Sequence, residues 1–222
     1  MSAVSAAASS KADRFPDRRL GVLISGRGSN LQALIDAIED GRLDARIAVV
    51  ISNRDDAGGL ERARRAGIDT LVRDHRGWPS RDEYDSMLAE DLRSRNVGVV
   101  CLAGFMRRVG LPLIEAFPAA IVNIHPSLLP AFPGLDAQRQ ALAHGVRVSG
   151  VTVHLVTAEL DAGPIIVQRA VQVLEHDTEE TLAARILVEE HKAFPEAVQR
   201  VLDGAWTLDG RRFVARPQDL RP

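Results

Sequence analysis

The chain has 222 residues, a hydrophobic fraction of 45% and a formal net charge of −2. This length predicts one domain, and the charge argues against a protein that binds nucleic acid or a membrane surface. The one cysteine, Cys101, excludes an internal disulfide and a cysteine-based zinc site. Because no apolar run approaches roughly 18 residues and residues 1–19 lack a signal-peptide pattern, we expect a cytoplasmic protein. We interpret residues 1–19 as a disordered tail and residues 20–216 as a single domain.

Short apolar segments alternate with helical patterns through the first 125 residues. Such alternation predicts a parallel sheet with right-handed crossovers. Strands are expected at residues 20–24, 47–51, 68–72, 97–102 and 119–125, and helices at 31–40, 59–66, 80–95 and shortly before 117.

The pattern changes after residue 125. Prolines and glycines interrupt residues 126–145, apart from a short helix at 137–143. Two strands at 150–156 and 165–173 flank a turn and predict an antiparallel hairpin. A long helix follows at 178–202, with Thr178 as its N-cap, and a small hairpin closes the chain. The expected class is therefore α/β: a Rossmann-like, open, mostly parallel sheet with a C-terminal antiparallel hairpin and a long helix. Its two halves would be 20–118 and 119–216.

A glycine-rich turn, Gly26-Arg27-Gly28-Ser29-Asn30, joins the first strand to the first helix. Exposed backbone amides and a helix N-terminus at such a turn predict an anion site that suits a monophosphate. The turn is not a dinucleotide fingerprint, because Leu31 stands at the third glycine position and Asn53 replaces the ribose-binding acid. It also lacks the lysine of a P-loop. The alternative is a plain tight turn with a helix cap.

The strand ending at residue 125 delivers two polar side chains, Asn123 and His125. Side chains two residues apart point to the same face of a strand, and Pro126 ends the strand there. Ligands of open α/β sheets bind outside the carboxyl ends of the strands, so this amide and imidazole are candidates for catalysis. Equally, both side chains could only satisfy loop carbonyls.

Other polar residues carry weaker signals. Asp161 lies in the turn of the predicted hairpin and would become a charge partner only if the fold brings it beside His125. His154 lies within a strand, where a hydrogen-bonded structural role is the simpler interpretation. Arg81, at a helix start, and the Arg107–Arg108 pair could hold anions, although most such arginines are solvated. The spacing of the histidines predicts no zinc site.

Five motifs together resemble the 10-formyltetrahydrofolate-dependent phosphoribosylglycinamide formyltransferases of purine synthesis. The resemblance covers about residues 20–210 and implies a formyltransferase-type fold. The motifs are Ile24-Ser25-Gly26-Arg27-Gly28-Ser29-Asn30-Leu31-Gln32, Ser52-Asn53-Arg54, Leu102-Ala103-Gly104-Phe105-Met106-Arg107, Asn123-Ile124-His125-Pro126-Ser127-Leu128-Leu129-Pro130 and Glu159-Leu160-Asp161-Ala162-Gly163-Pro164-Ile165.

The resemblance implies a role for each matching residue. Asn123, His125 and Asp161 match the catalytic trio. The phosphate and ribose side of glycinamide ribonucleotide would be held by Gly28, Ser29, Asn30 and Glu190. The folate would be held by Arg81, Met106, Arg107, Arg108, Val109 and Asn123, with the turn at 158–162.

The implied reaction transfers the formyl group of 10-formyltetrahydrofolate, a co-substrate, to the amine of glycinamide ribonucleotide. It needs no metal, and the family implies a monomer or a homodimer. The chain departs from the family pattern in its folate segments, where Arg108 and Val109 replace a more apolar pair and Ala162 replaces a frequent glycine. Asp136 and Gln138 stand where some members have histidine. None of these positions belongs to the trio.

Four alternatives stay open. A formyltetrahydrofolate hydrolase would use the same trio, but usually carries an N-terminal regulatory domain longer than residues 1–19. A methionyl-tRNA formyltransferase usually adds a basic C-terminal domain, unlike this net negative chain. A nicotinamide dehydrogenase is opposed by the incomplete fingerprint. A non-catalytic folate-binding module need not retain Asn123, His125 and Asp161 together. Dependence of deformylation on the acceptor would distinguish the transferase from these.

Overall fold

The computed structural model describes residues 14–216, whose strands form one nine-stranded sheet in the order β3-β2-β1-β4-β5-β6-β7-β9-β8. The first five strands run parallel, as the alternating pattern predicts. They are β1 (Arg19–Ile24), β2 (Arg46–Ser52), β3 (Thr70–Val72), β4 (Val99–Leu102) and β5 (Ile121–His125).

The sheet changes from parallel to antiparallel at β5. The next strand, β6 (Val148–Leu155), pairs antiparallel with β5 on one side and with β7 (Ile165–Gln172) on the other. The small terminal hairpin of β8 (Trp206–Asp209) and β9 (Arg212–Ala215) continues the sheet beyond β7. The predicted fold class, including its antiparallel C-terminal strands, is confirmed.

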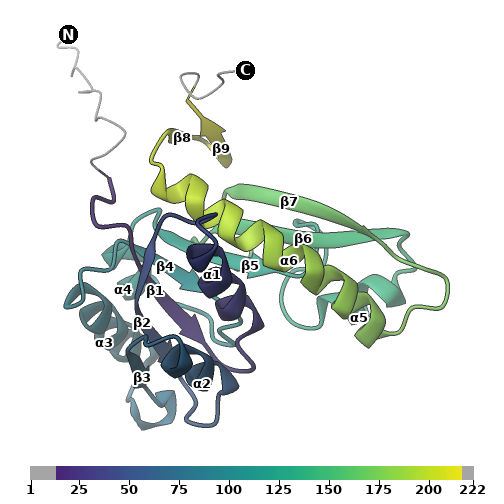
Figure 1. Ribbon diagram of the computed structural model, residues 1–222. Helices are drawn as coiled ribbons and strands as arrows, with labels where there is room; N and C mark the ends of the chain where they lie inside the picture. The colour runs from purple at the N-terminus through teal and green to yellow at the C-terminus, as the bar shows by residue number, and fades with distance from the viewer. Residues whose placement is uncertain (1–13, 217–222) are drawn as a thin grey trace.

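Helices cover the sheet in two groups (Figure 1). The long α6 lies beside α1 and packs on β6 and β7, whereas α3 packs against α4. Right-handed crossovers account for this division, because the chain moves outward from β1 to β3 and then returns to β4. The helices are α1 (Ser29–Glu39), α2 (Gly58–Arg65), α3 (Arg81–Arg93), α4 (Leu111–Ala116), α5 (Ala137–Ala143) and α6 (Glu179–Leu202), with a 3₁₀ turn, η1 (His75–Gly77).

The core follows the central strands. Every residue of β4 is buried, and so are residues 20–24 of β1, as expected for parallel strands that are covered on both faces. Cys101 is fully buried in β4, consistent with a small core residue. No helix among the described residues has the length and apolar composition needed to cross a bilayer.

The folded part begins earlier than the sequence suggests. Residues 1–13 of the expected tail lie outside the described residues, but residues 14–19 are ordered. Phe15 is buried against Gly98, and Arg18 forms an ion pair of 3.2 Å with Asp203. The assignment of residues 14–19 to a disordered tail is therefore wrong, because a buried aromatic side chain and a partly exposed ion pair fix them to the domain. The division into halves at 118 and 119 stays a proposal.

One strand is also shorter than expected. The sequence pattern predicts a strand from Ile68, whereas β3 begins at Thr70. The Ile68 amide instead donates to the Ala63 carbonyl at 2.9 Å, and the Gly67 amide donates to the Arg64 carbonyl at 3.0 Å. With Gly67 at a φ of +68°, this is a Schellman ending of α2. Capping of the helix therefore takes precedence over the apolar strand pattern.

Candidate active site

Two strands supply the polar side chains at the centre of the site. Asn123 and His125 follow one another on the same face of β5. The antiparallel register places His154 of β6 opposite Asn123, and Thr152 opposite His125. Directly opposed residues face the same side of a sheet. The pairing therefore brings His154 to the two predicted residues.

His125 is buried and lies between two acceptors. Its Nδ1 atom lies 3.5 Å from Oδ2 of Asp161, and its Nε2 atom lies 2.8 Å from the Phe132 carbonyl oxygen. The Asp161 side chain is 8% exposed, so this pair is largely shielded from water. The expectation that Asp161 folds back beside His125 is confirmed in its geometry. Each ring nitrogen of His125 therefore lies beside an acceptor oxygen.

His154 fixes the orientation of the Asn123 amide. Its Nδ1 atom lies 2.9 Å from the Leu155 carbonyl, which can only accept, so Nδ1 carries a proton. Burial lowers the pKa of His154, and the ring is therefore neutral with a bare Nε2. That atom accepts from the Asn123 amide nitrogen at 3.1 Å. One N–H of the amide is thus held by His154, and the other is left for a ligand.

Asp161 connects the hairpin turn to the loop that covers His125. Its backbone adopts a left-handed φ of +50°, and its Oδ2 atom accepts from the Gly134 amide at 2.7 Å. Its Oδ1 atom lies 3.8 Å from Nε2 of His154. The carboxylate therefore faces both histidines and also fixes the position of the loop at residues 131–136.

The predicted phosphate turn opens α1. Gly28, with a φ of +73°, precedes the helix, and no side chain caps the first turn. A Cβ at Gly28 would lie 2.5 Å from the Gly59 Cα, so this position needs glycine for space as well as for conformation. The Gly59 amide also donates to the Gly26 carbonyl at 3.0 Å. α2 therefore braces the turn, a contact that the sequence analysis missed.

Asn30 and Glu190 meet at this end of the sheet. The Asn30 amide donates to Oε2 of Glu190 at 2.7 Å, and both side chains are buried. Burial raises the pKa of Glu190. The Asn30 Oδ1 atom is buried without a protein hydrogen-bond partner among the described residues. Ser29 is half-buried in the first helical turn beside this pair. The turn thus offers free amides and an acceptor oxygen together.

The segment from Phe105 to Gly110 holds four of the residues predicted to bind folate. Met106 is 67% exposed, whereas Val109 is buried in the core. Arg107 lies over the Tyr84 ring at 5.0 Å, and Arg108 donates to the Ala158 carbonyl at 2.9 Å, which joins the two segments predicted to hold folate. Arg81 is exposed at the start of α3, where its Cδ atom lies beside Gly110. Their binding roles stay predictions.

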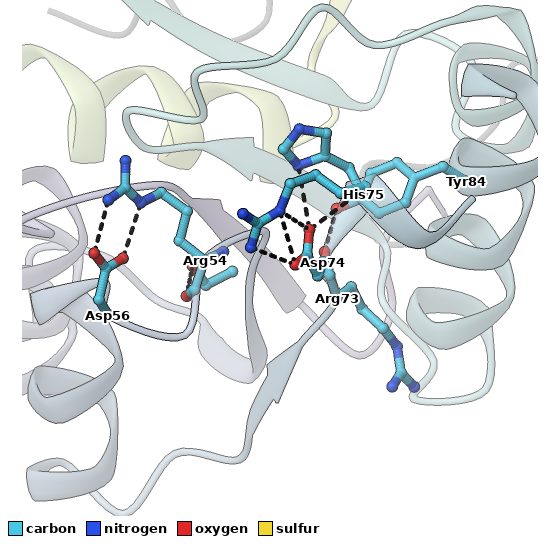
Figure 2. Close-up of polar contacts among 8 residues, drawn as sticks. Arg54, Asp56, Arg73, Asp74, His75 and Tyr84 are labelled. Carbon is cyan, nitrogen blue, oxygen red and sulfur yellow. Dashed lines mark hydrogen bonds and ion pairs between the residues drawn. The ribbon is translucent and has the colours of Figure 1, made fainter. Parts of the chain in front are cut away.

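Arginines near the ends of β2 and β3 are neutralised locally (Figure 2). Arg54 forms two hydrogen bonds with Asp56, at 2.9 and 2.7 Å. Arg76 is paired with Asp74 at 2.7 Å, and this contact lowers the pKa of Asp74 to about 2. Each guanidinium therefore has its own carboxylate, and this exposed cluster is a poor anion site. Among the described residues, no group of three or more His, Cys, Asp or Glu side chains is arranged to hold a metal ion.

An amide, an imidazole and a carboxylate thus meet at the carboxyl edge of an α/β sheet, an arrangement that suits an enzyme of the group-transfer class. The family model for formyl transferases matches residues 18–198. The chain is 44% identical over 200 residues to phosphoribosylglycinamide formyltransferase of Escherichia coli (strain K12), which covers 86% of this chain and 94% of that protein. The chain therefore belongs to the formyl transferase family.

Two further likenesses support this assignment. Glycinamide ribonucleotide transformylase 1 from Symbiobacterium toebii superposes with a TM-score of 0.88 at 58% identity, covering 89% of this chain and 93% of that chain. The trifunctional purine biosynthetic protein adenosine-3 of Drosophila pseudoobscura pseudoobscura is 51% identical over 208 residues, 93% of this chain. The chain spans 15% of the length of that relative.

Proposed function

We propose that this chain transfers the formyl group of 10-formyltetrahydrofolate to the amine of glycinamide ribonucleotide, a step of purine biosynthesis. The observation that carries the proposal is the meeting of Asn123, His125 and Asp161 at one sheet edge, with the His125–Asp161 contact at 3.5 Å. The free first turn of α1 supports a phosphorylated acceptor, and the Asn30–Glu190 pair beside it suits the ribose side of that acceptor.

The reaction needs donors for a transient negative oxygen. The amine nitrogen attacks the formyl carbon, a C–N bond forms, and the carbonyl electron pair moves to oxygen. Collapse restores the carbonyl and breaks the bond to N10 of the folate, and one proton passes overall from the amine to N10. The free N–H of Asn123 suits the oxyanion, and such a donor typically contributes about 10²–10³ in rate.

His125 offers a ring N–H to the same step, and Asp161, 3.5 Å from Nδ1, orients the ring. The carboxylate also suits proton transfer from the attacking amine through water, as a general base. The Phe132 carbonyl engages Nε2 in the unliganded chain. A direct hydrogen bond from that nitrogen to the oxyanion therefore requires the 131–136 loop to shift.

The decisive experiment compares deformylation of 10-formyltetrahydrofolate with and without glycinamide ribonucleotide. We expect release of tetrahydrofolate only with the acceptor present, together with one formylated ribonucleotide per folate released. Equal release without the acceptor would instead identify a hydrolase, and binding without deformylation would identify a folate-binding module. Sedimentation of the same protein would test whether it is a monomer or a homodimer, which stays a prediction, as does a cytoplasmic location.

A further inference from the structure

The Phe105–Gly110 segment lies outside the sheet and the helices. It follows β4 and precedes α4, and it carries four of the residues proposed to hold folate. A segment without ladder or helical hydrogen bonds has few constraints on its backbone. Two of its backbone amides nevertheless donate to buried side chains of neighbouring elements, one near each end.

The first anchor is Ser25 at the end of β1. Its hydroxyl oxygen accepts from the Met106 amide at 2.8 Å and donates to Oδ1 of Asn53 at 2.6 Å. Both polar side chains are buried. Because Asn53 fixes the direction of the hydroxyl proton, a lone pair of Ser25 is left for Met106.

The second anchor is Asp85 on α3. This carboxylate is only 2% exposed, and its Oδ2 atom accepts from the Gly110 amide. A Cβ at Gly110 would lie 3.0 Å from that oxygen and 3.4 Å from the Arg81 Cδ, so Gly110 packs directly on the first turns of α3. The carboxylate therefore holds the segment against the helix that presents Arg81.

The neighbour of Asp85 strengthens this connection. Tyr84 is fully buried, and its hydroxyl donates to the Arg73 carbonyl at 2.9 Å, as Figure 2 shows. Its ring carries the Arg107 guanidinium at 5.0 Å. Two consecutive residues of α3, Tyr84 and Asp85, thus contact Arg107 and Gly110, so the helix packs directly against the segment.

We propose that Asp85 is a positioning residue for binding of the folate co-substrate. Asp85 fixes the Met106–Val109 segment relative to Arg81, and Ser25 is the second anchor of that segment. The inference rests on the proposed function. It assigns Asp85 no contact with substrate: the carboxylate acts through the Gly110 backbone. Loss of the Asp85 anchor should therefore weaken binding of the folate but leave binding of the acceptor, at the α1 turn, unchanged.

The test measures KM for each substrate in Asp85→Ala, Asp85→Asn and Asp91→Ala. Asp85→Ala leaves a buried amide without an acceptor, so we expect KM for 10-formyltetrahydrofolate to rise at least about fivefold, with KM for the acceptor within about twofold. Asparagine retains an acceptor oxygen and should restore KM to within about threefold. Asp91 is a matched control, because this α3 carboxylate pairs with Arg73 at 2.6 Å and does not contact the segment.

Hydrogen exchange measures the loss of the Gly110 hydrogen bond directly. The Gly110 amide should exchange faster in Asp85→Ala but not in Asp91→Ala. Should Asp85→Ala fold poorly, Ser25→Ala tests the same segment from its other end and should also raise the folate KM selectively. An unchanged folate KM in folded, active Asp85→Ala or Ser25→Ala would overturn the inference and leave the proposed function standing. A wild-type chain that neither transfers formyl nor binds tetrahydrofolate in a calorimetric titration would overturn both.

Discussion

The two ends of the proposed site are built in different ways. The phosphate end depends on one short stretch between β1 and α1, where free helix amides and Gly28 are contiguous in the chain. The transfer end gathers Asn123, His125, His154 and Asp161 from a strand, its antiparallel partner and the turn beyond it. A local motif can therefore specify binding of an anion, whereas the chemistry depends on strand register.

The difference lies in the change of strand direction at β5. The parallel half places each strand end at the same edge, so a turn after any strand can meet a ligand. The antiparallel step to β6 instead aligns two strands residue by residue. Side chains far apart in the chain, such as Asn123 and His154, are then held in direct contact at 3.1 Å. Substitutions at the phosphate end should consequently weaken acceptor binding, whereas substitutions at the transfer end should lower kcat.

The largest effect is expected at His125. His125→Ala removes the imidazole proposed to act beside the oxyanion, and we expect kcat to fall at least about 10²-fold, the scale of proton-transfer groups. KM for the acceptor should change little, because the α1 turn is untouched. Steady-state rates with both substrates, with circular dichroism as a folding control, would test this. A near-normal rate in the folded variant would refute the assignment.

The corresponding change at the phosphate end is Ser29→Asp. A carboxylate at the first turn of α1 would repel the acceptor phosphate and remove a hydroxyl donor. Hydrogen bonds to charged groups contribute about 1.5–3 kcal/mol, so acceptor affinity should fall roughly 10–100-fold. Separate calorimetric titrations of glycinamide ribonucleotide and tetrahydrofolate measure the two sites, and Ser29→Ala separates lost hydrogen bonding from added charge. Equal weakening of both ligands would contradict a division between the two ends.

A smaller effect is expected at His154. His154→Phe keeps the ring volume but removes the acceptor that orients the Asn123 amide, a hydrogen bond of about 0.5–1.5 kcal/mol. We expect kcat to fall about threefold to tenfold. His154→Gln retains an acceptor and should recover part of the loss.

The pH profile distinguishes this positioning role from simple packing. Because burial lowers the pKa of His154, the ring stays neutral at pH values below the usual histidine range. Protonation at still lower pH would place an N–H against the Asn123 amide, so the wild-type rate should contain an acidic limb that His154→Gln lacks. Identical acidic limbs in the two proteins would show that the limb has another origin.

The smallest effect concerns stability at the phosphate end. Burial raises the pKa of Glu190 above the ordinary value of 4.5. As pH rises through that value, the unfolded chain releases a proton that the native chain retains, so Glu190 reduces the free energy of unfolding toward neutral pH. Glu190→Gln removes this pH-dependent decrease in the free energy of unfolding, and the glutamine carbonyl can still accept from the Asn30 amide. Thermal melts from about pH 5 to pH 8 should show the variant gaining Tm relative to wild type, and a constant difference would contradict it.

The sequence is sufficient to predict those elements and site residues whose signals are local in the chain. Alternating apolar segments predicted the parallel sheet, Thr178 was correctly placed at the start of α6, and its hydroxyl accepts from the Thr181 amide. Asn123 and His125 were found because they alternate at the end of a buried strand. The proximity of Asp161 to His125 came from the family resemblance, since a lone aspartate in a turn carries no such information.

The rest could not be predicted because it depends on contacts between distant segments. His154 was interpreted as a structural residue, and only the β5–β6 register reveals its contact with Asn123. The sequence does not distinguish Asp85 from the other acidic residues of its helix, and only the fold reveals its hydrogen bond with the Gly110 amide. Phe15 lies in a stretch whose composition suggests disorder, and its burial follows from a position beside Gly98 that no local pattern encodes.

The β5–β6 pairing also determines where the chain can change in length. A residue inserted or deleted within β6 would turn every later side chain of that strand to the opposite face and remove His154 from the site. The turn at residues 144–147, between α5 and β6, is less constrained, because it is mostly exposed and lengthening a loop costs entropy only slowly. Insertions in that turn should be tolerated, whereas a single deletion between Thr152 and His154 should abolish transfer.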